Sequence, residues 1–376
     1  MTRTKRGIFF TFPVDGLMLT DAAGEKTDGG LLISARVDAP EDSELYLNGV
    51  GMSTPSSTMF NMFRADTVLS PGRNVLELKD KKSGFCLSIT VFYLEKACRT
   101  YRFSLDDNIW FLQNVNEHKD VYPSIFCDPY LAMIKDIHDR FGSKFHINVY
   151  YRTDRHGGFD LSQMTDKFRN EFIANSDWIR MSFHADADEP PRPYAHASYE
   201  KTFFEADRIN REIIRFAGEE TFSKTVCTVH CGDISIEGAR ALRDLGYRAL
   251  LATYEYLHKS GLDIRTYLDA EQCVYLQRYG FWYDKDTDIC HFKYNGGIQH
   301  SDPGDFAEIF SAQEKDMPAY LFKDLCLHEQ YFYPEFRLYQ NNYPKKLETA
   351  CLWLKDNGYE PIFMDELFGF DTHRKK

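Results

Sequence analysis

Four segments of the sequence carry residues that can bind a metal ion or transfer protons, each directly after an apolar run. They are Asp106-Asp107, His184, His230 and His328-Glu329. Carboxylate and neutral imidazole groups bind divalent ions such as Zn²⁺, Ni²⁺ and Co²⁺. Such an ion acidifies water and polarises a carbonyl group, while a free carboxylate and an imidazole act as base and acid. These residue types indicate metal-assisted hydrolysis.

The pattern of the chain after residue 100 indicates how these segments meet. Apolar runs alternate with amphipathic stretches; the runs are 101–105, 144–151, 178–183, 224–229, 249–252, 318–327 and 360–364. Strands that alternate with helices predict a parallel α/β sheet. About seven such units over roughly 275 residues favour a barrel, in which the carboxyl ends of the strands form one mouth. We expect the four segments to converge there.

The first part of the chain has a different pattern. Short strand-like runs are separated by turn signals such as Asn48-Gly49 and Pro71-Gly72, which is typical of a small β-sandwich. We therefore predict two domains. Residues 1–100 form a small all-β, immunoglobulin-like sandwich, and residues 101–376 form an α/β barrel that holds every candidate catalytic group.

Two motifs resemble the polysaccharide deacetylase superfamily, the NodB-homology fold of carbohydrate esterases. Residues 103–107 read Phe-Ser-Leu-Asp-Asp and match its first motif; residues 325–330 read Leu-Cys-Leu-His-Glu-Gln and match its last. The resemblance covers roughly residues 101–368. It implies a distorted (β/α)7 barrel, a divalent metal such as zinc (nickel or cobalt being alternatives) and a carbohydrate substrate. It also implies Asp106 as the general base, Asp107 as a metal ligand and His328 as the general acid.

Two other motifs depart from that family. The second motif, His-x-x-x-His, retains His184, but Asp188 stands where the second histidine belongs, and His196 lies further along. In the third motif, His230 replaces an arginine. Asp188, His196 and His230 therefore compete to be the third metal ligand.

Two other functions remain open from the sequence. Glu329, with Glu255 as its counterpart, could supply the two carboxylates that glycoside hydrolysis needs. The irregular second motif also leaves room for a catalytically silent carbohydrate-binding protein.

Aromatic residues make up 15% of the chain. Many lie in the late segments 275–283 and 331–339, which we expect to be loops. They either form a substrate rim or fill the core, and the position of 331–339 just after His328 favours a rim. Cys231, beside His230, is the one cysteine with a candidate role at the site.

The overall charge excludes several classes of partner. The formal net charge is −12, so we expect no nucleic acid or anionic membrane as a partner and a neutral or positively charged glycan as substrate. No stretch has the roughly 18–20 apolar residues of a membrane helix. Nine scattered cysteines do not form a disulfide framework, which favours the cytoplasm. The oligomeric state stays open.

Overall fold

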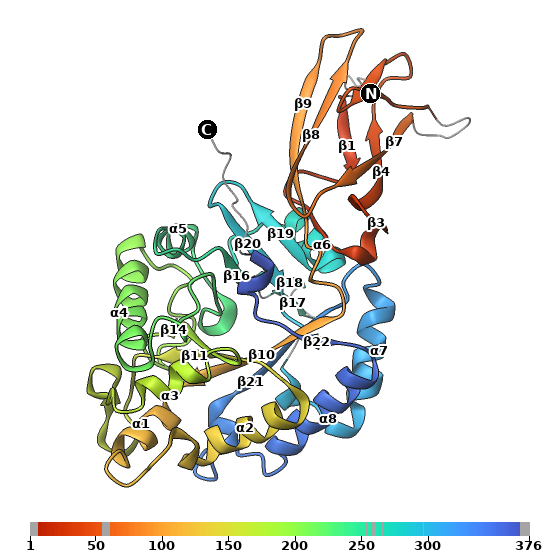
Figure 1. Ribbon diagram of the computed structural model, residues 1–376. Helices are drawn as coiled ribbons and strands as arrows, with labels where there is room; N and C mark the ends of the chain where they lie inside the picture. Colours follow the sequence, from red (N-terminus) through yellow and green to blue (C-terminus); the bar gives the residue numbers. More distant parts are fainter. Residues whose placement is uncertain are drawn as a thin grey trace.

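The computed structural model describes residues 7–54, 61–252, 254–257, 261–264, 266–295 and 297–368, with the backbone alone for 254–257 and 261–264. Figure 1 shows an α/β body from which the N-terminal strands project. Within the described residues, no helix combines the length and the apolar character needed to cross a membrane.

The N-terminal region forms two β-sheets. The first contains β1 (Phe9–Phe12), β3 (Glu25–Thr27), β4 (Gly30–Asp38) and β7 (Met62–Leu69). The second contains β2 (Met18–Leu19), β5 (Leu45–Leu47), β6 (Val50–Gly51), β8 (Gly72–Asp80) and β9 (Cys86–Tyr93). Alternate side chains of β4, β8 and β9 lie in one buried cluster, so the two sheets share a core. The immunoglobulin-like order and the boundary at residue 100 stay predictions.

The body holds two sheets of mainly parallel strands. The first has the order β14 (Ile179–Ala185), β11 (Phe145–Tyr150), β10 (Thr100–Asn108) and β21 (Phe322–His328), with β22 (Glu360–Pro361) beside the start of β10. The second has β15 (Val226–Cys227), β16 (Ala249–Ala252), β20 (Ile289–Lys293) and the antiparallel β19 (Phe281–Asp284). Isolated bridges join Met181 to Phe222 and Gly297 to Cys326. The parallel α/β class is confirmed; closure into a seven-stranded barrel stays a prediction.

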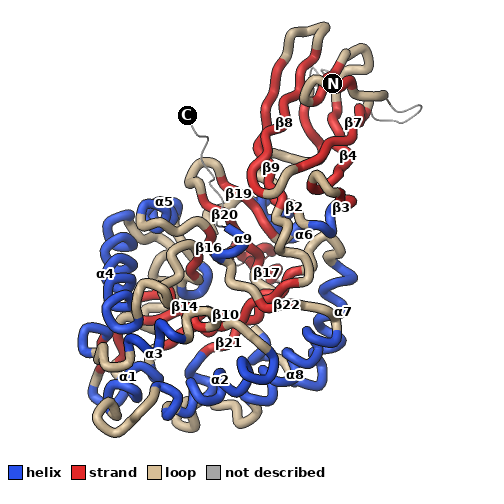
Figure 2. The backbone as a smooth tube through the Cα atoms, viewed as in Figure 1, coloured by secondary structure: helices blue, strands red, loops and turns tan. Residues whose placement is uncertain are grey.

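The helices complete the body. They are α1 (Trp110–Glu117), α2 (Pro129–Phe141), α3 (Arg169–Ala174), α4 (Tyr199–Ala217), α5 (Ile236–Asp244), α6 (Ala270–Tyr279), α7 (Phe306–Asp316), α8 (Tyr343–Asp356) and α9 (Asp365–Phe368). Figure 2 shows α2, α4, α5, α7 and α8 around the outside of the strands. Two short hairpins, β12–β13 (Arg152–Thr153 and Phe159–Asp160) and β17–β18 (Tyr254–Leu257 and Gly261–Ile264), lie outside the sheets.

The core of the N-terminal sheets continues into the body. Leu276 and Tyr279 of α6 and Trp282 of β19 belong to the same buried cluster as the inner faces of β4 and β8. The expectation that residues 275–283 form a loop is therefore wrong: they form a helix and a strand. Tyr279 and Trp282 pack with the N-terminal core, and Phe281 packs against rings of the body, so this run fills the core, which was one of its two expected roles.

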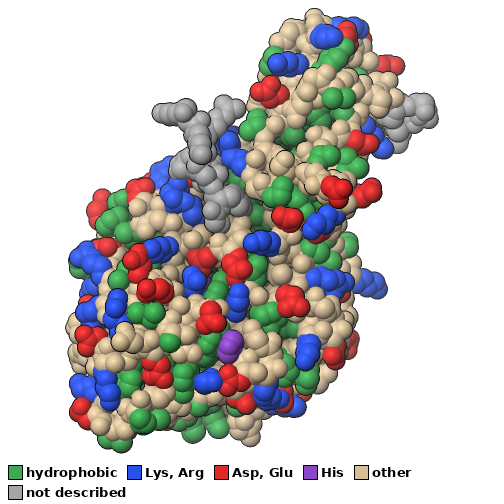
Figure 3. Space-filling model, in the orientation of Figure 1, with side chains coloured by type: hydrophobic (Ala, Val, Ile, Leu, Met, Phe, Trp, Pro, Cys, Tyr) green, Lys and Arg blue, Asp and Glu red, His purple; other side chains and the backbone are tan. Residues whose placement is uncertain are grey.

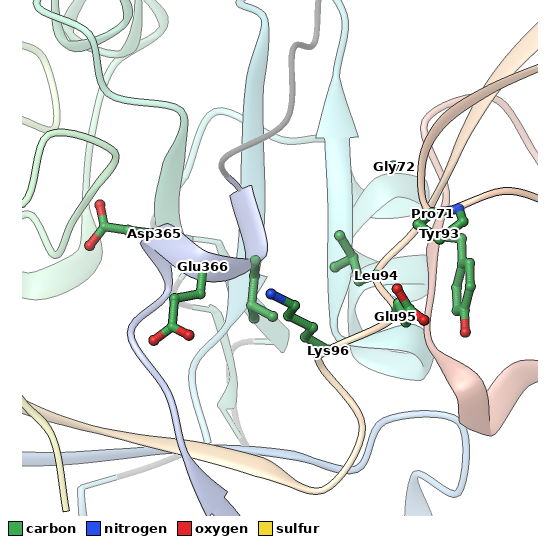
Figure 4. A pocket seen from close by; sticks show the side chains of 9 residues that line it. Pro71, Gly72, Tyr93, Leu94, Glu95, Lys96, Asp365 and Glu366 are labelled. Carbon is green, nitrogen blue, oxygen red and sulfur yellow. The ribbon is translucent and has the colours of Figure 1, made fainter. Parts of the chain in front are cut away.

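A pocket also lies at this seam. Figure 4 shows it between Pro71 and Gly72 of the N-terminal region, Lys96 of the connecting segment, and Asp365 and Glu366 of α9. Its volume is about 430 Å³. Figure 3 shows acidic and basic side chains interspersed over this face of the molecule.

Candidate metal centre

The carboxyl end of β10 carries both aspartates of the predicted site. Asp106 pairs with His328 in the β10–β21 register. The register with β11 shifts between Leu105 and Asn108, and Asp107 has a left-handed φ of 61°. Neighbouring side chains of a regular strand point to opposite faces, but a bulge re-aims one of them. This local backbone lets both carboxylates act at the same end of the sheet.

Asp107, His184 and His230 bring three ligand-type atoms together. Asp107 Oδ1 lies 2.9 Å from His184 Nε2 and 3.2 Å from His230 Nδ1, and the two nitrogens are 3.2 Å apart. All three residues are buried. Ligand atoms about 2.0–2.1 Å from a tetrahedral zinc ion are about 3.3 Å from one another. The three distances therefore fit a divalent ion of that size.

The surroundings of the triad suit cation binding. His184 Nδ1 donates to the carbonyl oxygen of Thr228 at 2.5 Å, which fixes the neutral tautomer with a lone pair on Nε2. Burial by itself raises the pKa of Asp107, but the imidazoles of His328, His184 and His230 outweigh it and hold the pKa well below its usual value. Asp107 is therefore ionised, and the imidazoles that donate to it would release those protons when an ion binds.

The geometry separates the three candidates for the third ligand. His230 alone contributes an atom to the triad. Asp188 lies one step further out, where its Oδ1 is 3.3 Å from the hydroxyl oxygen of Tyr150. His196 is exposed on the segment before α4 and contributes no atom to the triad.

Asp106 is buried and accepts hydrogen bonds from three neutral donors, one of them to Oδ2. Its Oδ1 accepts hydrogen bonds from Ser104 Oγ at 2.8 Å and Asn148 Nδ2 at 2.7 Å, and its Oδ2 accepts from Cys326 Sγ at 3.2 Å. These bonds orient the carboxylate beside the triad, and Asp106 lines the same cavity as His184 and His230. This position suits a group that takes a proton from water.

His328 lies across the cavity at the end of β21. Its Nε2 is 3.9 Å from Asp107 Oδ2, and its side chain is 27% exposed, more than those of the triad. Its Nδ1 lies 2.8 Å from Gln299 Nε2. With the amide assigned this way, Gln299 donates to Nδ1, so Nε2 carries the proton of the neutral ring and points into the cavity.

Glu329 does not join this group of side chains. Its carboxylate accepts hydrogen bonds from the backbone N–H groups of Ile109, Trp110 and Phe111 at 2.6–2.9 Å and from the Tyr333 hydroxyl at 3.1 Å. It caps the start of α1, which Ile109 has no side chain to cap. Burial raises the pKa of Glu329 to about 7, although the N–H donors oppose it. We assign Glu329 a structural role; the side chain of Glu255 lies outside the described residues.

Tyr150, the last residue of β11, is a site residue that the sequence reasoning missed. Its hydroxyl oxygen lies 2.5 Å from Asp107 Oδ1 and 2.9 Å from His230 Nδ1. It therefore contacts two of the three triad atoms and Asp188 as well. The signal was available, because Tyr150 ends an apolar strand next to β10, where functional side chains are expected.

Two hollows lie near these residues. The first, about 220 Å³, is lined by Asp106, His184, His230, Cys231 and His328, so Cys231 does face the site. The second is a groove of about 340 Å³ lined by residues that include Trp110, Tyr150, Asp188 and Phe336. Phe336 belongs to the predicted aromatic run 331–339, and one ring of that run therefore borders the groove.

Comparisons with known proteins add little. No family model and no curated protein matches the chain. A 4-alpha-glucanotransferase from Thermococcus litoralis aligns over 72% of this chain at 12% identity with a TM-score of 0.45, and this chain spans only 40% of it. A Bacteroides fragilis protein assigned as an alpha-galactosidase aligns over 90% of this chain and 77% of its own length at 9% identity, with a TM-score of 0.27. Likenesses this slight assign neither a fold family nor an activity.

Proposed function

We propose that this protein is a metal-dependent hydrolase that removes an acyl group from a carbohydrate. The observation that carries the proposal is the buried triad of Asp107, His184 and His230, whose ligand atoms are 2.9–3.2 Å apart. A divalent ion held there, zinc first and nickel or cobalt as alternatives, would supply Lewis acidity to the carbonyl oxygen and to a water molecule.

The neighbouring side chains would perform the proton transfers. Asp106, oriented by Ser104 and Asn148, would take the proton of the water that attacks the acyl carbon. His328, once protonated on both ring nitrogens, would then give its Nε2 proton to the leaving amine or hydroxyl of the sugar, with the Gln299 amide turned so that its oxygen accepts from Nδ1. Tyr150 would orient Asp107 and His230 through its hydroxyl group.

The carbohydrate part of the proposal rests on the motif resemblance at residues 103–107 and 325–330. Cleavage of a glycosidic bond is the second candidate. Two carboxylates keep it open, because Asp106 lines the cavity at the triad and Asp188 lines the groove that contains Tyr150. Glu329 does not serve as a carboxylate for glycosidic cleavage, since both of its oxygens accept hydrogen bonds from the start of α1.

A metal analysis tests the site and a substrate panel tests the reaction. The wild-type protein, stripped with a chelator and reloaded with Zn²⁺, Ni²⁺ or Co²⁺, should bind one ion per chain, and Asp107→Ala should bind none. Asp188→Ala is the matched control, because Asp188 lies outside the triad, and it should bind the ion like the wild type. Unchanged metal content in Asp107→Ala would remove the basis of the proposal.

The panel pairs acetylated chito-oligosaccharides and acetylated xylan with their unacetylated forms. Metal-dependent release of acetate supports the proposed reaction. Release of new reducing ends that persists in the chelated protein would favour glycosidic cleavage instead. Binding of a saccharide without any product would support the catalytically silent alternative.

A further inference from the structure

Another cavity, lined by none of the triad residues, lies at the seam between the N-terminal sheets and the body. Its volume is about 610 Å³, within the range of small-molecule sites. Three arginines line it: Arg36 of β4, Arg64 of β7 and Arg278 of α6. Figure 1 shows α6 directly beneath the N-terminal sheets, so that the two regions face each other here.

The charges at this cavity are unbalanced. Among the described residues that line it, Asp316 is the one carboxylate. None of the residues that the structure describes forms an ion pair or a side-chain hydrogen bond with the three guanidinium groups. In a chain whose formal net charge is −12, a cavity lined by three arginines and one carboxylate is unexpected.

Two of these arginines lie side by side, Arg36 half-buried and Arg64 exposed. Arg36 and Arg64 are direct cross-strand partners on antiparallel β4 and β7. Like charges in that position destabilise a sheet. An anion lying between the two guanidinium groups would convert this repulsion into attraction.

Two of the guanidinium groups are also held in place by aromatic rings. Arg36 lies over the ring of Phe12, 5.0 Å from its centre, and Arg278 lies over the ring of Tyr279 at 5.3 Å. Stacking on an aromatic face leaves the N–H edges of the guanidinium free and limits the entropy lost when they bind an oxyanion. The remaining lining includes Ala22, Ala23, Pro318 and Ala319, short side chains that leave room for a ring and offer apolar contact to its C–H groups.

We propose that this cavity is a binding site for an anionic saccharide, one that carries carboxylate or sulfate groups. The arginines would bind the anionic groups and the short apolar side chains would contact the ring. This ligand differs from the neutral or cationic glycan expected at the triad from the overall charge. The proposal goes beyond the proposed function and does not depend on it, because none of these residues lies at the triad.

Calorimetric titration of the full chain tests the proposal with three disaccharides: one containing glucuronic acid, one O-sulfated and one neutral (cellobiose). At least one anionic disaccharide should bind, with an affinity that falls as NaCl is raised, and cellobiose should not. Arg64→Gln and Arg278→Gln should each weaken this binding at least tenfold. Lys79→Gln, an exposed change on β8, is the matched control and should bind like the wild type.

A second measurement guards against misfolded variants. Because it relieves the Arg36–Arg64 repulsion, Arg64→Gln should melt at a higher temperature than the wild type without ligand, yet gain less stability when the saccharide is added. Asp107→Ala should bind the anionic saccharide normally, which separates this site from the triad. Equal binding of cellobiose, binding of inorganic sulfate as tight as that of the saccharides, or wild-type affinity in both arginine variants would overturn the proposal.

Discussion

Replacing Glu329 by glutamine should change stability in a way that depends on pH. The glutamine keeps the shape but has one acceptor oxygen, which can serve Ile109 and Trp110, while its NH₂ group faces the N–H of Phe111. One buried backbone N–H is then left without an acceptor, which costs about 1–3 kcal/mol. This is the difference expected at pH 4.5 and below, where Glu329 and glutamine are both neutral.

The difference should shrink as the pH rises. Burial raises the pKa of Glu329 from 4.5 to about 7 in the folded protein, so between these values the folded state keeps a proton that the unfolded state has lost. The wild type therefore loses stability as the pH rises through this window, by about 3 kcal/mol in total for 2.5 pKa units. The glutamine does not titrate, so near pH 8 the variant should equal or exceed the wild type in stability.

Urea unfolding at pH 4.5, 6 and 8, followed by tryptophan fluorescence, measures this. Titrations elsewhere in the chain affect both proteins and cancel in the difference. Glu237→Gln, an exposed glutamate in the first turn of α5, should differ from the wild type by less than about 0.5 kcal/mol at every pH. A wild-type-minus-variant difference that does not change with pH would refute the argument from burial, and no loss of stability at pH 4.5 would refute the role of Glu329 as a cap.

Three further outcomes are expected. His230→Ala should lose the bound ion, as elemental analysis would reveal, whereas His196→Ala should keep it. Tyr150→Phe should keep the fold but weaken ion affinity or activity by roughly 10- to 100-fold, because the hydroxyl group orients the ligands. If ion affinity and activity were both unchanged, Tyr150 would have no role at the site. Gly280→Ala should destabilise the protein by several kcal/mol in thermal unfolding, because Gly280 has a φ of +80° and a Cβ there would lie 1.8 Å from Tyr320.

The strand ends of the body were predictable, and they carried most of the candidate site. Apolar runs ending on Asp106-Asp107, His184 and His328 can be read from the chain, and parallel strands deliver their carboxyl ends to one place. His230 was harder, because β15 has only two residues and the histidine follows in an irregular turn. Only distances in the folded structure show that His230, and not Asp188 or His196, joins Asp107 and His184. Spacing along the chain does not reveal these distances.

Other features depended on contacts between distant segments. Nothing near Glu329 in the sequence shows that the uncapped start of α1, more than two hundred residues earlier, lies against it. Helix α6 was missed although Asp269 and Gln272 form a capping box, because its aromatic-rich pattern resembled a loop with a binding surface. In the structure those aromatic rings face the N-terminal sheets, a partner that local periodicity cannot reveal.

The common core of the N-terminal sheets, α6 and β19 has a consequence for how the chain melts. A module attached by a linker would unfold in its own calorimetric step. Here, removal of the N-terminal sheets would expose Leu276, Tyr279 and Trp282 to water, so the part of the body that faces these sheets stays buried only while they are in place. The whole molecule should therefore behave as one cooperative unit, and a shortened chain that begins at β10 should aggregate instead of folding as an independent enzyme.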